Sequence, residues 1–270
     1  MNKKEKKVLD LLKSKGVSQQ QLEVLLESKE RFISIRQKRR TRKYKFGIVS
    51  DTHLVDKSCA LDELHDFYKR CKREGVHDIV HAGDILSGMN VYKGQIVDLE
   101  RYGIDEHLEF GLKNYPREEG IKTYFILGNH DLDYKNTAGI DIGKHLAKRP
   151  DLIYVGMYDA TLTLNGITIG LHHGGGGASY ALSYKLQKYV EKIGSDQKPQ
   201  IYILGHYHGA FYMFYRNIHC FLPACFQKPT DLSVRFGLPN CVGGWIVEVE
   251  IADDECNSID KITYEFIPYY

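Results

Sequence analysis

The sequence predicts an α/β domain with a small helical appendage at its N-terminus. From Lys45 onward, short apolar runs alternate with longer mixed segments, which is the pattern of strands connected by helices. Hydrophobic residues make up 43% of the 270 residues, enough for a large packed core. Residues 1–44 lack the strand pattern and contain two stretches with helical spacing of apolar residues.

The predicted N-terminal appendage, residues 1–44, consists of a helical arm and a basic linker. Ser18 and Gln21 have the spacing of a capping box, and Gly16 lies where the first of two short helices should end. Residues 36–43 are charged without an apolar period, which is typical of a linker. Two interpretations of the arm stay open: a helix-turn-helix-like arm that binds DNA, and an appendage for packing or oligomerisation.

Charge is distributed unevenly along the chain. Residues 1–45 hold 15 Lys or Arg against 5 Asp or Glu, a net charge of +10, and the remaining residues hold 22 against 30, a net charge of −8, consistent with +2 for the whole chain. A basic segment is thus joined to an acidic body. Basic arms can contact nucleic acid, whereas acidic clefts often hold metal ions.

The predicted domain, residues 45–270, begins with strands and helices in alternation and ends in a β-rich region. The strands are assigned from short apolar runs bounded by turn residues, and the helices from longer segments with apolar residues on one face. In chain order these elements are strand 46–49, helix 61–74, strand 78–81, helix 105–114, strand 123–127, helix 140–147, strands 153–155, 161–164 and 168–172, helix 180–193, strand 201–204, and strands within 211–267.

Composition excludes several classes of protein. The six cysteines form no C-x-x-C pair, which argues against a disulfide framework or a zinc ribbon, and we predict that they are reduced. No apolar run approaches the roughly 20 residues of a membrane span, and the N-terminus lacks the features of a secretory signal. We therefore expect a cytoplasmic protein that does not enter the membrane. The sequence does not predict its oligomeric state.

Five predicted strands are followed by side chains that can bind a metal ion. In open α/β sheets, ligands bind in the crevice beyond the carboxyl ends of the strands, so we expect these five segments to converge on one place. The segments are Asp51-Thr-His53, Asp84, Asn129-His130-Asp131, His172-His173 and His206-Tyr-His208.

The spacing and the chemistry of these residues favour a site with two divalent ions. Asp51 and His53 are two residues apart, as are His206 and His208, so each pair points to one side of an extended backbone. Carboxylates, an amide and imidazoles without sulfur suit Mn²⁺, Fe or Zn²⁺, and contain too much nitrogen for a dedicated Mg²⁺ or Ca²⁺ site. The set offers more ligands than a single ion needs.

The ordered motifs D-x-H, G-D, G-N-H-D, a later H and G-H-x-H resemble those of the calcineurin-like metallophosphoesterase superfamily. The motifs cover residues 46–208, and residues 88–95 and 180–188 further resemble a phage and prokaryotic branch. The resemblance implies a four-layer α-β-β-α sandwich for residues 45–270.

The resemblance also implies a role for each motif residue. Asp51, His53, Asp84 and His208 would bind one ion, and Asp84, Asn129, His173 and His206 the other, with Asp84 as the bridge. His130 would face the substrate and assist the leaving group. Asp131, the second residue assigned to catalysis, would orient His130 or the Asn129 loop rather than act as a base. Within the pair His172-His173 we prefer His173 as the ligand, and the choice stays open.

The expected function is metal-dependent hydrolysis of a phosphoester. Two ions can share a water molecule, lower its pKa and direct the metal-bound hydroxide at phosphorus. Because the N-terminal segment is basic, we expect a phosphodiesterase or nuclease with nucleic acid as a candidate substrate. The ligand chemistry makes Mn²⁺ the favoured metal. Two alternatives stay open: a phosphomonoesterase that acts on a small molecule or a protein, and a non-catalytic scaffold. Gln227 and Arg235 could reach a substrate, but no local pattern assigns them a role.

Overall fold

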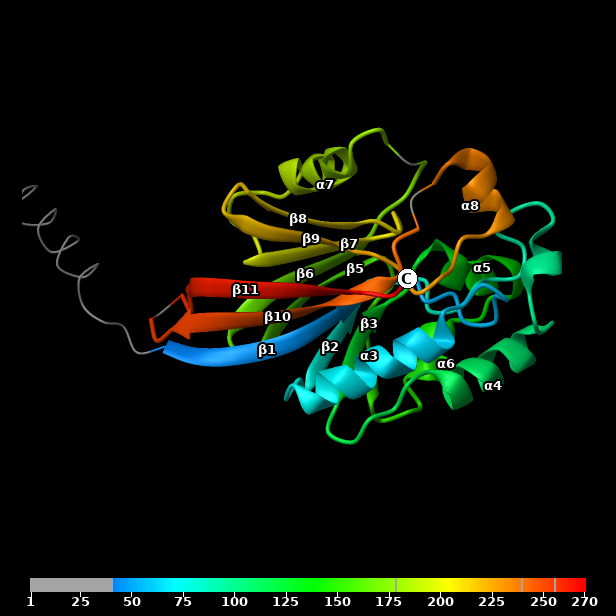
Figure 1. Ribbon diagram of the computed structural model, residues 1–270, viewed down its shortest axis with the longest axis horizontal. Coiled ribbons are helices and arrows are strands. Elements are labelled where there is room, and N and C mark those ends of the chain that lie inside the picture. Colours follow the sequence, from blue (N-terminus) through cyan, green and yellow to red (C-terminus); the bar gives the residue numbers. More distant parts are fainter. Residues whose placement is uncertain (1–40, 178, 239, 255) are drawn as a thin grey trace, which may run out of the picture. The chain divides into compact units, whose positions relative to one another are not determined.

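The computed structural model describes residues 41–270 apart from 178, 239 and 255, and these residues form two stacked β-sheets with helices on both outer faces (Figure 1). The predicted four-layer α-β-β-α sandwich is therefore confirmed. Nearly all of the predicted N-terminal appendage, residues 1–40, lies outside the described part of the chain, so its predicted helices and DNA binding stay predictions.

The first sheet, counted over the described residues, has six strands in the order β11-β10-β1-β2-β3-β4. β1 to β4 run parallel to one another, whereas β10 pairs antiparallel with both β1 and β11. The strands are β1 Thr41–Val49, β2 Asp78–His81, β3 Lys122–Ile126, β4 Leu152–Gly156, β10 Gly243–Ala252 and β11 Ile259–Pro268.

The second sheet has five strands within the described residues, in the order β5-β6-β7-β9-β8. β6, β7 and β9 are parallel neighbours, and the two outer strands are antiparallel to the strands beside them. The strands are β5 Asp159–Leu164, β6 Ile167–His173, β7 Ile201–Gly205, β8 Ala210–Tyr215 and β9 Ile218–Pro223.

Helices cover the outer faces of the sheets: α3 to α6 lie against the first sheet and α7 lies against the second (Figure 1). None of the described helices is long and apolar enough to cross a membrane. The helices are α3 Leu61–Arg73, the 3₁₀ helix η1 Gln95–Asp98, α4 Ile104–Asn114, α5 Asn129–Ala138, α6 Ile142–Leu146, α7 Leu182–Glu191 and α8 Asp231–Phe236.

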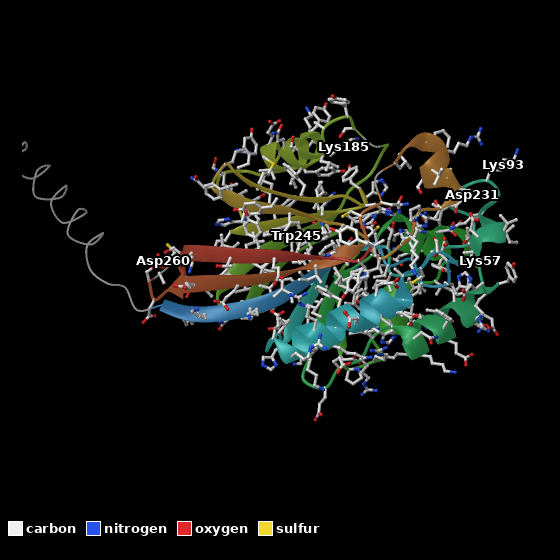
Figure 2. The ribbon with its side chains drawn as sticks, viewed as in Figure 1. Lys57, Lys93, Lys185, Asp231, Trp245 and Asp260 are labelled. Carbon is white, nitrogen blue, oxygen red and sulfur yellow. The ribbon has the colours of Figure 1, made fainter. Side chains whose placement is uncertain are left out.

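Three hydrophobic clusters join the four layers, because alternate residues of a strand point to opposite faces of its sheet. In β1, Phe46 and Ile48 point between the sheets, whereas Val49 points toward the helices. Figure 2 shows Trp245 between the two sheets, where its indole donates a hydrogen bond of 3.0 Å to the backbone carbonyl of Leu222. The inter-sheet layer therefore fixes the two sheets relative to each other.

Some elements differ from the sequence-based prediction. β1 begins at Thr41, so part of the predicted linker belongs to the strand. The strand is extended there by antiparallel pairing with β10, where Thr41 lies opposite Ala252. α5 and α8 were not predicted. α5 has no regular apolar period, since its buried positions are filled largely by Asp131, Asp133 and Tyr134, and α8 has only six residues.

Candidate metal centre

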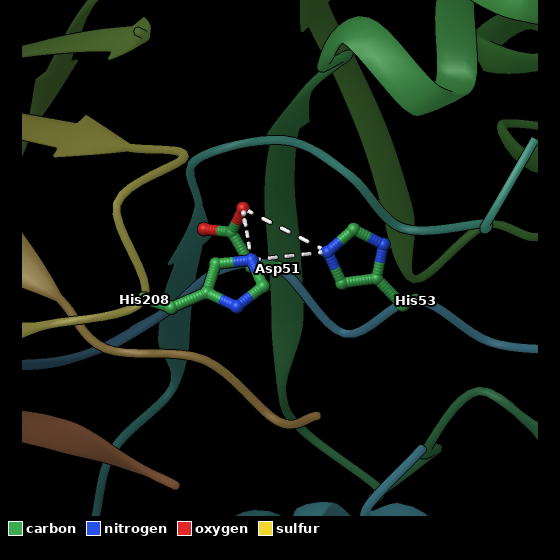
Figure 3. Close-up of side chains that lie close together, drawn as sticks. All are labelled: Asp51, His53 and His208. Carbon is green, nitrogen blue, oxygen red and sulfur yellow. Dashed lines mark hydrogen bonds and ion pairs between the residues drawn. The ribbon is translucent and has the colours of Figure 1, made fainter. Parts of the chain in front are cut away.

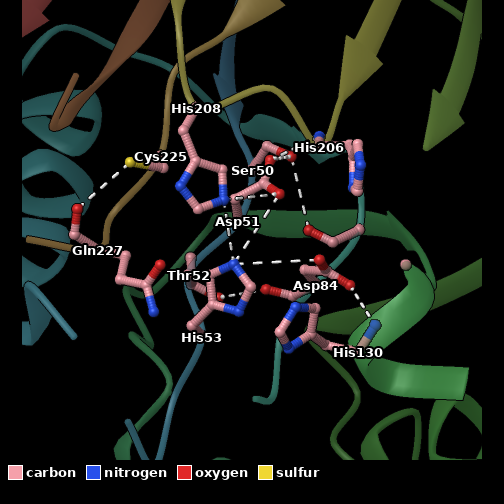
Figure 4. Close-up of polar contacts among 12 residues, drawn as sticks. Ser50, Asp51, Thr52, His53, Asp84, His130, His206, His208, Cys225 and Gln227 are labelled. Carbon is pink, nitrogen blue, oxygen red and sulfur yellow. Dashed lines mark hydrogen bonds and ion pairs between the residues drawn. The ribbon is translucent and has the colours of Figure 1, made fainter. Parts of the chain in front are cut away.

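The seven predicted metal ligands come together where strands of both sheets reach their carboxyl ends. Figure 4 labels five of them: Asp51, His53, Asp84, His206 and His208. Because β1, β2 and β3 are parallel, the loops that follow them open at the same edge of the first sheet, and β6 and β7 do the same in the second. The ligands are Asp51 and His53 after β1, Asp84 after β2, Asn129 at the start of α5, His173 at the end of β6, and His206 and His208 after β7.

A first group consists of Asp51, His53 and His208, whose side chains face one another in Figure 3. The Nε2 atoms of the two imidazoles are 3.2 Å apart. Asp51 Oδ1 lies 3.4 Å from His208 Nε2 and 4.0 Å from His53 Nε2. Asp51 is fully buried, and its Oδ1 has no hydrogen-bond partner among the described residues.

A second group surrounds His173 and contains Asp84, His206 and Asn129. His173 Nε2 lies 3.2 Å from Asp84 Oδ2 and 3.1 Å from Asn129 Oδ1. His206 belongs to the same group, and its ring centre is 5.3 Å from that of His173. Asp84 Oδ2 also lies 3.9 Å from His53 Nε2, so this carboxylate borders both groups.

Both groups have the dimensions and the chemistry of divalent metal sites. Bonds of about 2.0–2.2 Å from an ion place neighbouring ligand atoms about 2.8–3.6 Å apart, depending on the coordination geometry. Four separations within the groups, from 3.1 to 3.4 Å, agree with this range, whereas Asp51 Oδ1 and His53 Nε2 are farther apart at 4.0 Å. Asp51 Oδ1 is a buried acceptor without a hydrogen bond, a costly arrangement that a bound cation would relieve. The residues therefore fit divalent ions.

The electrostatics of the buried ligands also favour a cation. Burial alone would raise the pKa of Asp51, but the close contact with the His208 imidazole and the charge of that ring hold it below the usual range. In the same way, the charges of His173 and His130 outweigh burial and lower the pKa of Asp84. Both carboxylates are thus ionised at neutral pH, as metal binding requires. The charge of Asp84 in turn raises the pKa of His173 to about 9 against the effect of burial.

The backbone of five ligands adopts the left-handed region of φ, which residues other than glycine seldom occupy. Such conformations cost roughly 1–3 kcal/mol each and persist where the surroundings hold them. Here the Asp51 amide donates to the Gly83 carbonyl (2.9 Å) and the His206 amide donates to Asp51 Oδ2 (3.0 Å). The φ angles are 51° for Asp51, 44° for His53, 57° for Asp84, 84° for His206 and 50° for His208.

Two glycines let the chain segments pack closely around Asp84. A Cβ on Gly128 would lie 2.1 Å from Asp84 Oδ1, far inside van der Waals contact. Gly83 has a φ of +96°, and its Cβ would lie 2.5 Å from His173 Nδ1. The loops that carry the ligands can approach one another only because these side chains are absent.

His130 is held beside both groups with one ring nitrogen anchored. Its Nδ1 lies 2.6 Å from the Ser87 carbonyl, which can only accept, so Nδ1 carries the hydrogen. The His130 backbone amide donates to Asp84 Oδ1 (2.8 Å), as Figure 4 shows. The ring packs edge-on against His53 at a centroid distance of 4.5 Å and lines the adjacent cavity. Ser87, which sequence reasoning missed, is fixed in turn by a hydroxyl bond to the His53 carbonyl.

Asp131 is fully buried and is not among the described residues that line the cavity. Its carboxylate accepts hydrogen bonds from the backbone amides of Ile85 (3.0 Å), Leu86 (2.8 Å) and Gly128 (3.0 Å). It thereby ties the loop of Asp84 to the loop before Asn129. Burial, followed by the charge of Asp84, raises the pKa of Asp131 to about 7.

The structure places His173, rather than its neighbour His172, among the candidate metal ligands. Successive residues of β6 point to opposite faces, so the two imidazoles diverge. His173 is buried, and its Nδ1 donates to the Ala82 carbonyl at 2.7 Å. His172 instead packs on Tyr189 of α7 at a centroid distance of 4.7 Å.

A cavity of about 240 Å³ adjoins the ligands and His130. Its described lining includes the acidic Asp84 and four histidines but neither Lys nor Arg. Sequence reasoning missed most of the other lining residues, because they lie in loops without an apolar period. The lining consists of His53, Asp84, Tyr92, His130, Gly176, Gly177, His206, Tyr207, His208, Gln227, Thr230, Leu232, Ser233, Leu238 and Asn240.

Residues 44–230 match the family model described as the calcineurin-like phosphoesterase superfamily domain. No curated protein matches the sequence. Among solved structures, the chain is similar to an archaeal phosphodiesterase, with 16% identity, coverage of 83% of this chain and 99% of the other, and a TM-score of 0.48. The zinc complex of Vps29 from Entamoeba histolytica is 12% identical, with coverage of 83% of this chain and 98% of the other and a TM-score of 0.42. A predicted phosphoesterase from Streptococcus pneumoniae is 16% identical, with coverage of 84% of this chain and 99% of the other and a TM-score of 0.40.

Proposed function

Because this chain belongs to the calcineurin-like phosphoesterase superfamily, whose members bind divalent metal ions, we propose that it is a metal-dependent phosphodiesterase. The observation that carries the proposal is the pair of ligand groups that meet at Asp84 beside His130 and an open cavity. A non-catalytic scaffold of the same fold would have no need of this complete set.

We assign Asp51, His53, Asp84 and His208 to one ion, and Asp84 with Asn129, His173 and His206 to a second. The nitrogen and oxygen donors favour Mn²⁺, and Fe and Zn²⁺ also suit them. Bound ions of this kind activate water and neutralise the charge that develops on phosphate oxygens. The chain itself contributes the positions of the ligands, which the left-handed backbone and the close loop packing define.

His130 is assigned the transfer of a proton to the leaving oxygen. Its Nδ1–H is anchored on the Ser87 carbonyl, which leaves Nε2 as the ring atom able to hold and donate a proton at the cavity. Asp131 is a positioning residue, since its three backbone hydrogen bonds hold the loops of Asp84 and Asn129 rather than any group in the cavity.

The cavity favours a diester over a monoester. A monoester carries a charge of about −1.5 to −2 at neutral pH, whereas a diester carries a single negative charge. Phosphatases that select dianions benefit from added cations. The described lining contains neither Lys nor Arg, and one cation lies at its edge: the Lys185 ammonium, 5.7 Å from the centre of the Tyr207 ring. A nucleic-acid strand requires basic side chains along successive phosphates. The excess basic charge of this chain lies in residues 1–45, so action on nucleic acid would depend on that segment.

The test compares hydrolysis of bis-p-nitrophenyl phosphate with hydrolysis of p-nitrophenyl phosphate after chelation and readdition of Mn²⁺. We expect the diester to be the better substrate, turnover to require Mn²⁺, and Asp84→Ala to abolish both turnover and Mn²⁺ binding. Monoester preference would favour the phosphatase alternative. Absence of turnover on either compound, with Mn²⁺ bound, would favour the scaffold.

A further inference from the structure

Gln227 presents its side-chain amide to the cavity next to the metal centre. The residue lines that cavity and is 8% exposed. Its amide makes no hydrogen bond to any described residue, and the amide atoms do not belong to the fully buried polar atoms that lack a partner. The donor and the acceptor of this amide therefore reach the space of the cavity, where a ligand can bind them.

The backbone around Gln227 is held firmly against the metal-binding loop. The Gln227 carbonyl accepts hydrogen bonds from Asn240 Nδ2 (3.2 Å) and Cys225 Sγ (3.3 Å). The amide of the preceding residue, Phe226, donates to the Asp51 carbonyl at 3.0 Å. Because Asp51 is itself a proposed ligand, these bonds hold the backbone of Gln227 beside the loop that carries a ligand, and Figure 4 shows the contact between Cys225 and Gln227 next to His208.

Two leucines and a tyrosine are among the other residues that line the cavity, together with polar residues such as Thr230 and Asn240. Leu232 and Leu238, within α8 and just after it, are 39% and 38% exposed although both line the cavity. α8 is held in shape by a capping box in which Thr230 and Ser233 bond reciprocally. The Tyr207 ring is fixed by hydrogen bonds between its hydroxyl and the backbone of Gly175 at 2.9 and 3.3 Å.

This combination of walls selects for a particular kind of chemical group. A glutamine amide offers a donor and an acceptor in one plane, so it pairs with a planar group that presents both along one edge. Bare leucine side chains and a fixed aromatic ring favour a flat, uncharged body, and stacking on an aromatic ring is worth about 1–3 kcal/mol for a nucleobase. Among groups attached to natural phosphodiesters, nucleobases combine these properties.

We propose, on the basis of the proposed function, that Gln227 recognises a nucleobase and that the substrate is a nucleoside phosphodiester. Gln227 would then determine specificity by binding the base edge, with Leu232, Leu238 and Tyr207 covering its faces. The recognition does not depend on a run of phosphates, in keeping with a described cavity lining that contains no Lys or Arg.

The experiment compares substrates that share one leaving group. Thymidine 3′- and 5′-p-nitrophenyl phosphates and methyl p-nitrophenyl phosphate are hydrolysed with Mn²⁺, and the products are separated by chromatography. We expect kcat/KM for the better thymidine ester to exceed that for the methyl ester by at least about tenfold, and Gln227→Leu to reduce this ratio about 10- to 100-fold. Gln187→Leu on α7, outside the cavity, makes the same chemical change and should leave the ratio as it is.

A second measurement reports binding without turnover. Thymidine 5′-monophosphate is titrated calorimetrically into the Mn²⁺-loaded protein, with inorganic phosphate as the comparison. We expect the nucleotide to bind about tenfold or more tightly than phosphate, and this advantage to disappear in Gln227→Leu.

The outcomes separate the two proposals. If none of the diesters is hydrolysed, the proposed function fails. If the methyl ester is hydrolysed but the thymidine esters are not preferred, the nucleobase proposal is overturned and the phosphodiesterase proposal stands. If a preference exists and Gln227→Leu, folded by its thermal midpoint, keeps both the preference and the nucleotide affinity, the role of Gln227 is overturned.

Discussion

Replacing Gly128 with alanine tests whether close packing around Asp84 positions the metal centre. Gly128 has φ −110° and ψ −173°, which alanine adopts without strain, so the substitution introduces only a steric change. The added Cβ would lie 2.1 Å from Asp84 Oδ1 and 2.6 Å from the Asp84 backbone nitrogen. Rotation of the carboxylate cannot relieve the second contact, so the loops themselves must separate.

The size of the effect follows from these distances. Ordinary contact begins at 3.4 Å, so the carboxylate must retreat by 3.4 minus 2.1, or about 1.3 Å. A misplacement of about 1 Å at a catalytic site can lower the rate about 100-fold. Overpacking of this kind typically costs about 1–3 kcal/mol in the free energy of unfolding. Because Asp84 borders both ligand groups, we expect weaker Mn²⁺ binding and about 100-fold slower hydrolysis of bis-p-nitrophenyl phosphate.

The assay measures Mn²⁺ affinity by calorimetry, turnover with bis-p-nitrophenyl phosphate, and unfolding by urea. Gly175→Ala is the matched control, since Gly175 lies in a loop close to the same site and its Cβ would meet nothing within 4 Å. A Gly128→Ala protein with the Mn²⁺ affinity and turnover of the control would refute the reasoning that the missing side chain sets the position of Asp84.

Three further predictions concern other parts of the molecule. His130→Gln should keep Mn²⁺ affinity and lower kcat about 10²- to 10⁴-fold; a loss of metal with unchanged kcat in saturating Mn²⁺ would contradict its role in proton transfer. Calorimetry should show loss of at least one Mn²⁺ site in His173→Ala but not in His172→Ala, because only His173 lies in the centre, and equal losses would contradict this assignment. Leu186→Ala should lower the free energy of unfolding by about 2–5 kcal/mol, since Leu186 is fully buried between α7 and the second sheet. The fluorescence of the single tryptophan, Trp245, reports unfolding in urea. A change in the free energy of unfolding below about 0.5 kcal/mol would show that this layer does not contribute to the cooperative fold.

The α/β class could be expected from the sequence because its signals are local, whereas the four-layer sandwich was implied by the family resemblance. Apolar runs such as Ile201–Leu204 identify strands, and the alternation of strands with helices predicts parallel pairing. Parallel strands end at one edge of a sheet, so the polar residues that follow them could be expected to meet. The extent of β1 could not be predicted in this way, since it depends on pairing with β10 at the far end of the chain.

Only part of the candidate site could be predicted from the sequence. The pairs Asp51 with His53 and His206 with His208 stand out by their spacing, and the choice of His173 over His172 was a preference. The structure shows the two imidazoles on opposite faces of β6. It also shows that Asp131 holds backbone amides of two loops, a role that no pattern of neighbouring residues reveals.

By itself, the sequence determined most of the order of strands and helices, the candidate metal-binding side chains and the place where they should gather. Only the tertiary structure decided which loops surround the cavity, how Asp84 comes to border both ligand groups, and that Gln227 lines the cavity. The physical reason is the distance along the chain over which each kind of interaction acts. Apolar periodicity and turn chemistry act between near neighbours in the chain, whereas the surroundings of a single polar side chain depend on packing with segments more than a hundred residues away.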